Sequence, residues 1–152
     1  MDEITPATGQ TSTDIPAMIR WLARQGNNEA LYRFTIACCR RIWGELPEPC
    51  QRVVEHAERV GVHDIDDVLA DASKAIAKLE RQFHKSADET EQARLSRQIG
   101  FARMVFAFEF QDVSEMAGSI SNDLIAWAKD PAAERSVQAD LLRDCADDGQ
   151  YE

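Results

Sequence analysis

Glycine and proline are scarce in this chain, which has 7 glycines and 5 prolines among 152 residues. An all-β fold needs many tight turns, and these two residues supply much of the backbone geometry that such turns require. The hydrophobic fraction of 44% and the charged fraction of 29% are ordinary for a globular protein. We therefore predict an all-α fold, a single-domain bundle of about six or seven helices with a mobile N-terminal tail.

Long apolar runs are also lacking. No stretch approaches the roughly 18 apolar residues that a membrane span needs. The sequence begins Met-Asp-Glu, and no apolar core of a secretory signal follows. We expect a cytoplasmic protein that keeps its thiols reduced and has no membrane as a partner.

The short motifs of common catalytic sites are missing as well. The chain has no glycine-rich phosphate loop, no HExxH or GxSxG motif and no EF-hand loop. Its net charge of -10 repels phosphate backbones, and we identify no basic stripe, so nucleic acid is disfavoured as a partner. We expect no enzyme activity and no cofactor, and a protein as the partner.

Apolar periodicity divides the chain into three parts. Residues 1–12 show no periodicity and are expected to form a disordered tail. Residues 13–146 repeat apolar positions at helical spacing and form the predicted helical domain, and residues 147–152 are an acidic end that we expect to fray. Within the domain we expect one helix to run to about Gln111, and we expect helix caps and stops at Asp14, Asn27, Asp64, Gly26 and Gly61.

Residues 31–43, Leu-Tyr-Arg-Phe-Thr-Ile-Ala-Cys-Cys-Arg-Arg-Ile-Trp, are the most informative stretch. In a helix they form two apolar seams about 100° apart, and a helix this apolar packs against two or more neighbours. Residues 101–110 are apolar nearly all round and form the second predicted centre. The side chains that we expect in the core are Phe34, Cys38, Cys39, Ile42, Trp43 and Phe106.

Charged residues interrupt both apolar stretches. Arg103 and Glu109 lie within 101–110, and Arg33, Arg40 and Arg41 lie within 31–43. We expect Arg33 or Arg40 to pair with Glu109, because an unpaired charge is costly to bury. These five residues form either a buried polar network or a partner-binding site, and Arg41 is the one that we expect to face a partner.

The four cysteines are Cys38, Cys39, Cys50 and Cys145. With His56, three of them fall within about twenty residues, but none of the Cys-x2–4-Cys pairs typical of zinc sites is present, so we predict no metal ligands. A cysteine nucleophile needs an accessible thiolate, whereas the apolar seams predict buried and inert thiols. We therefore predict no catalytic residues.

Three segments resemble an uncharacterised all-helical family of planctomycete-type bacteria. Phe34-Thr-Ile-Ala-Cys-Cys-Arg-Arg-Ile-Trp43 is similar to the family's Phe-Ala-x-Ala-Cys-Cys-Arg-Arg-Ile-Trp motif. Arg52-Val-Val-Glu-His-Ala-Glu-Arg59 and Gln138-Ala-Asp-Leu-Leu-Arg-Asp144 match two further segments, whereas residues 64–130 lie outside the resemblance. The resemblance implies a bacterial helical protein in which Cys38, Cys39, Arg40, Arg41 and Trp43 act as a unit, and it carries no established activity.

Three functional hypotheses follow. The first is a non-catalytic helical protein-interaction module, an adaptor or a subunit of a bacterial system. The second is an acidic inhibitor or immunity protein for a basic toxin or nuclease, because residues 129–152 hold seven acids and three bases, a net charge of -4. The third is a domain that binds a small molecule or metal around Cys38, Cys39, Arg40 and Glu109.

Overall fold

The computed structural model describes residues 14–150, and it describes side chains up to Asp147. These residues form seven α-helices and two 3-10 helices and contain no strand, which confirms the all-α prediction. The predicted tail at 1–12 lies outside the described residues. Helix α8 continues to Gln150, and residues 151–152 of the predicted frayed end also lie outside them. Among the described residues, no helix combines the length and apolar character that a membrane crossing requires.

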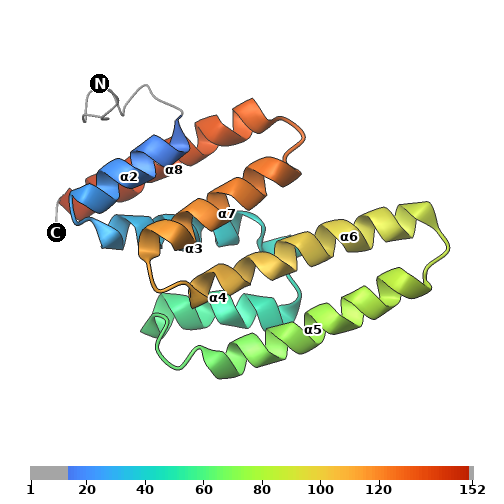
Figure 1. Ribbon diagram of the computed structural model, residues 1–152. Helices are drawn as coiled ribbons and strands as arrows, with labels where there is room; N and C mark the ends of the chain where they lie inside the picture. Colours follow the sequence, from blue (N-terminus) through green and yellow to red (C-terminus); the bar gives the residue numbers. More distant parts are fainter. Residues whose placement is uncertain (1–13, 151–152) are drawn as a thin grey trace. The chain divides into compact units, whose positions relative to one another are not determined.

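The chain divides into two compact units. The first unit contains α2 (Ile15–Arg24), α7 (Val113–Trp127), α8 (Pro131–Gln150) and α3 (Asn28–Arg41) as far as Cys38. Helix α2 packs against α7 and α8, which also pack against each other (Figure 1). Apolar side chains fill the core of this unit, among them Ile15, Leu22, Leu31, Phe34, Met116, Ile120 and Leu142.

Local capping signals set the first helix boundaries as the sequence predicts. The Asp14 carboxylate accepts a hydrogen bond from the backbone N–H of Ala17 at 3.2 Å. The Asn27 side chain accepts one from the backbone N–H of Ala30, also at 3.2 Å. Between them Gly26 adopts φ +73°, a conformation that favours glycine after a helix end.

A buried polar pair joins α7 to α8. The Ser121 hydroxyl donates to the Gln138 side-chain oxygen at 2.5 Å, and the Gln138 amide donates to the Ser121 carbonyl at 3.3 Å. The same amide reaches Glu134 at 2.8 Å. Because each buried polar atom has a partner, the pair fixes the helix register without the cost of an unsatisfied group.

The second unit covers Cys39–Glu109. It contains α4 (Glu48–Val60), α5 (Asp66–Lys85), α6 (Glu89–Arg103) and the 3-10 helices η1 (Trp43–Glu45) and η2 (Met104–Glu109). Helix α5 packs against both α4 and α6, and α5 and α6 run antiparallel as a long hairpin (Figure 1). Its core is built from apolar side chains, including Val53, Val54, Leu69, Ile76, Leu95, Ile99 and Phe108.

The predicted continuous helix to Gln111 is wrong, because the chain tightens into η2 after Arg103. A 3-10 helix has three residues per turn, so residues three apart share a side. Met104 with Ala107 and Val105 with Phe108 are buried in this way, while Phe106 and Glu109 share the outer side. The apolar pattern of the segment therefore follows a period of three.

The turn between α4 and α5 contains a second departure from expectation. Gly61 ends α4 with φ +77°, as predicted. Asp64 does not cap α5: it adopts φ +55°, and the cap position is Ile65, which makes no side-chain cap hydrogen bond. Aspartate tolerates this left-handed conformation better than most residues do.

We expect the substitution Asp64→Val to lower the free energy of unfolding by about 1–2 kcal/mol, because a β-branched residue is strained at positive φ. The conservative control Asp64→Asn tolerates the same positive φ and should change the free energy of unfolding little. Urea unfolding of both variants measures the difference. Equal losses in the two variants would show that the backbone conformation at this position has no energetic weight.

Candidate functional site: the outer face of α5 and the adjoining groove

The predicted core residues divide into two groups. Phe34, Cys38 and Cys39 are fully buried, as expected. Ile42, Trp43 and Phe106 are only half-buried, so their placement in the core is corrected. Helix α3 ends at Arg41, which places Trp43 in η1 instead of on a buried seam, and Phe106 faces outward on η2.

Two buried cysteines have strongly perturbed thiols. Burial raises the pKa of Cys39 from 9.0 to about 12, and the negative charge of Glu58 adds to the effect. Burial also raises the pKa of Cys50 from 9.0 to about 12. Both thiols are therefore neutral near pH 7 and are poor nucleophiles and poor metal ligands. Among the side chains that the structure describes, no group of three or more His, Cys, Asp or Glu residues could hold a metal ion.

Arg40 joins three elements of the second unit. Its Nε donates to Glu58 Oε2 on α4 at 3.0 Å, and its terminal nitrogen pairs with the other carboxylate oxygen. The guanidinium carbon lies 3.9 Å from the centre of the Trp43 ring. The hydrogen bond to Glu58 is the largest cause that raises the pKa of Arg40. Bidentate pairing and stacking use the planar shape of arginine, which lysine does not share.

Two further contacts hold the η1 turn. The Gln51 side chain donates to the Trp43 carbonyl at 2.9 Å. Arg97 Nε on α6 donates to Glu45 at 3.2 Å, and the Arg97 guanidinium lies 4.7 Å from the Phe101 ring centre. The turn that leads into α4 is therefore fixed from α3, α4 and α6.

The predicted buried network is not formed by the residues that the sequence indicated. Arg33 pairs with Glu29 on its own helix at 2.6 Å. Arg40 pairs with Glu58 and not with Glu109, and both Arg40 and Glu109 are exposed. Arg103 is exposed as well and pairs with Glu80 on α5. Arg41 is exposed at the end of α3.

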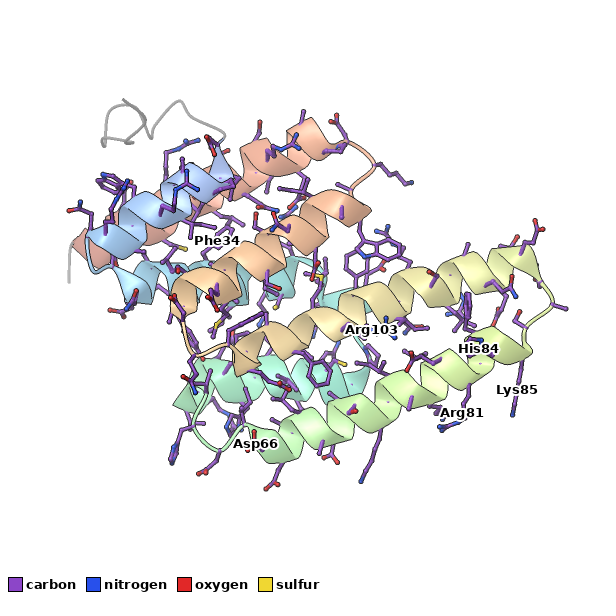
Figure 2. All side chains as sticks on the ribbon, viewed as in Figure 1. Phe34, Asp66, Arg81, His84, Lys85 and Arg103 are labelled. Atoms are coloured by element: carbon purple, nitrogen blue, oxygen red, sulfur yellow. The ribbon has the colours of Figure 1, made fainter. Side chains whose placement is uncertain are left out.

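Helix α5 carries a basic stripe, which corrects the expectation that the chain has none. Leu69, Ala72 and Ile76 form its buried side. At about 100° per residue, Lys78 lies roughly 160° around the helix from Ile76. The exposed cations on this outer side are Lys74, Lys78, Arg81 and Lys85. Figure 2 shows Arg81 and Lys85 projecting from α5 away from α6.

None of these four cations forms an ion pair with any carboxylate in the described part of the chain. Their spacing of four, seven and eleven residues keeps them on one face over roughly 16 Å of helix. We name this set the basic face of α5. The spacing of these cations is visible in the sequence, but the net charge of -10 masks it.

A groove lies beside the basic face, between α5 and the start of α4. Its volume is about 610 Å³. Apolar side chains and cations both line it: Pro47, Pro49, Ala75 and Leu79 are apolar, Arg52, Lys74 and Lys78 are basic, and Asp71 and Gln82 complete the wall. Two residues of the basic face therefore border an apolar surface.

Helix α8, in the first unit, presents the opposite charge. Asp140, Asp144 and Asp147 are exposed and lie on one helix side, away from the buried Gln138 and Leu142. Arg143 pairs with Asp140 at 2.5 Å. We name these three aspartates the acidic face of α8.

We expect Arg40→Lys to lower the free energy of unfolding by about 1 kcal/mol, because lysine loses the bidentate pair with Glu58 and the flat stacking on Trp43. The matched control is Arg52→Lys, which alters an exposed pair on one helix turn and should cost no more than about 0.5 kcal/mol. Chemical unfolding of both variants provides the comparison, and equal effects would argue against a special role for Arg40.

The perturbed thiols predict a pH dependence of stability. A thiol whose pKa is raised by folding stabilises the native state fully below its unfolded pKa near 9.0, and this contribution is lost as pH rises toward about 12. Between pH 8 and pH 10 we expect the free energy of unfolding of the wild type to fall by about 1 kcal/mol per thiol. The free energy of unfolding of the variant Cys39→Ala should fall by about 1 kcal/mol less over the same pH range, because this variant lacks one of the two thiols. An identical loss in wild type and variant would show that Cys39 does not contribute.

Comparison with protein-family models, curated proteins and solved structures found no match to this chain. The resemblance of three segments to a planctomycete-type family stays a prediction. Two of those segments are nevertheless joined in the structure, because Arg40 and Trp43 belong to one and Glu58 belongs to another. The function must be inferred from the charges and contacts of the described residues.

Proposed function

We propose that this protein is a non-catalytic helical protein-interaction module, an adaptor or subunit of a bacterial system. The basic face of α5 carries the proposal. Its four cations are exposed, share one side of the helix and pair with no carboxylate of the described chain. In a protein with a net charge of -10, a patch of this sign stands out from the surrounding surface.

The basic face does little for the fold itself. Lys74 with Lys78 and Arg81 with Lys85 are like-charge pairs four residues apart, which destabilise a helix by about 0.2–0.5 kcal/mol each. Lys85 gains from the helix dipole in the last turn, but Lys74 and Lys78 lie too far from the C-terminus to share that gain. A negatively charged partner surface would relieve the repulsion, which favours an interaction role over a structural one.

The thiols give no support to a catalytic or ligand-binding role. Cys39 and Cys50 are buried with pKa values raised to about 12, so neither supplies a thiolate near pH 7. Arg40, which the small-molecule hypothesis invokes, is engaged by Glu58 and Trp43. Non-catalytic binding therefore remains the better supported class.

The acidic face of α8 favours a second candidate function. Three exposed aspartates on one helix side suit an inhibitor or immunity protein that covers the basic surface of a toxin or nuclease. In that case the partner would be basic, and it would dock on α8 instead of α5.

Affinity purification from the source cells under native conditions, with quantitative mass spectrometry, tests the proposal. With the double variant Arg81→Glu/Lys85→Glu we expect the recovered amount of the proteins that co-purify with the wild type to fall at least about tenfold. The reason is that electrostatic attraction becomes repulsion. The control Arg20→Glu/Arg135→Glu changes the net charge equally at exposed positions elsewhere and should retain them.

Loss of the same proteins from both double variants would contradict a role for the basic face of α5. If the double variant Asp140→Lys/Asp144→Lys loses the co-purifying proteins while Arg81→Glu/Lys85→Glu retains them, the inhibitor function would instead be favoured. Thermal unfolding of each variant confirms that the comparison is made between folded proteins.

A further inference from the structure

The groove between α5 and the start of α4 combines two kinds of surface. Pro47, Pro49 and Leu79 offer an apolar wall, and Lys74 and Lys78 place two cations along its rim. Neither lysine pairs with a carboxylate of the described residues. A ligand that fits both surfaces must carry an apolar group and negative charge close together.

The groove is preformed by rigid parts. Pro47 occupies the cap position of α4 with φ -58°, and Pro49 lies in its first turn. Proline rings have fixed backbone geometry, so they present the same wall whether or not a ligand is bound. The preceding η1 turn is held by Gln51 and by the Arg97–Glu45 pair. A preformed wall lowers the entropy lost on binding.

We propose that this groove binds an acidic peptide segment of a partner protein. An apolar side chain of the peptide packs between Pro47, Pro49 and Leu79, and its neighbouring carboxylates face Lys74 and Lys78. The proposal rests on the interaction function proposed above and names the chemistry of the partner. Asp71 lies at the same groove and repels carboxylates, so the acids of the peptide are directed toward the two lysines.

The lining favours an acidic peptide over a nucleic acid. A phosphate backbone would meet the lysines but has no apolar group that suits the proline and leucine wall. The net charge of -10 also repels an extended polyanion more strongly than a short acidic peptide. The groove therefore selects for apolar content as well as charge.

A second copy of this chain fits the groove less well. The acidic face of α8 has the charge that the lysines require, but its aspartates project from a regular helix, and one of them already pairs with Arg143. A few exposed ion pairs do not offset the translational and rotational freedom lost on association. An apolar group in the groove supplies the stabilisation that such pairs lack.

Fluorescence anisotropy on the full chain tests the proposal with three labelled probes. The first is a short glutamate-rich peptide with one central leucine, the second has serine in place of the leucine, and the third is a single-stranded oligonucleotide of equal charge. We expect the leucine peptide to bind at least about tenfold more tightly than either of the other two probes. We also expect its binding to weaken as salt is raised.

Two substitutions test separately the contribution of charge and that of the open volume of the groove. Lys78→Glu should weaken binding of the leucine peptide about tenfold, since it replaces attraction with repulsion. Ala75→Trp adds no charge but fills the groove and should weaken binding by a similar factor. The matched controls are Arg135→Glu and Ala93→Trp, at exposed positions outside the groove, and they should leave binding within about twofold of the wild type. Thermal unfolding verifies that each variant is folded.

Equal binding of the leucine and serine peptides, or tighter binding of the oligonucleotide, would overturn the groove proposal. Self-association of the wild type that Lys78→Glu abolishes would also overturn it, since the occupant would then be a second copy. If no peptide binds while reversal of Arg81 and Lys85 still releases the co-purifying proteins, the groove proposal fails and the proposed function stands. If that reversal releases nothing, the proposed function fails independently.

Discussion

The path of the chain from α3 into α4 depends on one interaction, the contact of Arg40 with Glu58 and Trp43. A planar guanidinium makes a bidentate pair with the carboxylate on α4 and lies over the indole that begins η1. Three elements meet at this one side chain, so the chain leaves α3, turns and enters α4 in a defined geometry. That geometry places Pro47 and Pro49 beside α5, where they form the wall of the groove.

Three carboxylates of the unit are engaged by arginines. Glu58 is taken by Arg40, Glu45 by Arg97 and Glu80 by Arg103. The cations on the outer side of α5 have no such partner among the described residues, and burial of Leu69 and Ile76 on the opposite side fixes their direction. The same packing that stabilises the hairpin thus presents an unbalanced positive face, and this asymmetry is the physical basis for an interaction role.

Local signals predicted much of the fold, and long-range pairings could not be predicted. Asp14, Asn27 and Gly26 act within a few residues of themselves, so their caps and stops could be identified from the sequence. Arg40 and Glu58 are 18 positions apart, and many other carboxylates compete for the arginine. The 3-10 helix at residues 104–109 is marked in the sequence only by a period of three inside an apolar run. The basic face of α5 was readable from its spacing, whereas the groove beside it arises only from packing.

Hydrogen exchange measured on the protein with and without a partner that co-purifies with it tests the central claim most directly. An interaction at the outer side of α5 predicts added protection within 71–85 and around the start of α4, with little change in α8. Protection confined to α8, with α5 unchanged, would contradict the account and favour docking through the acidic face.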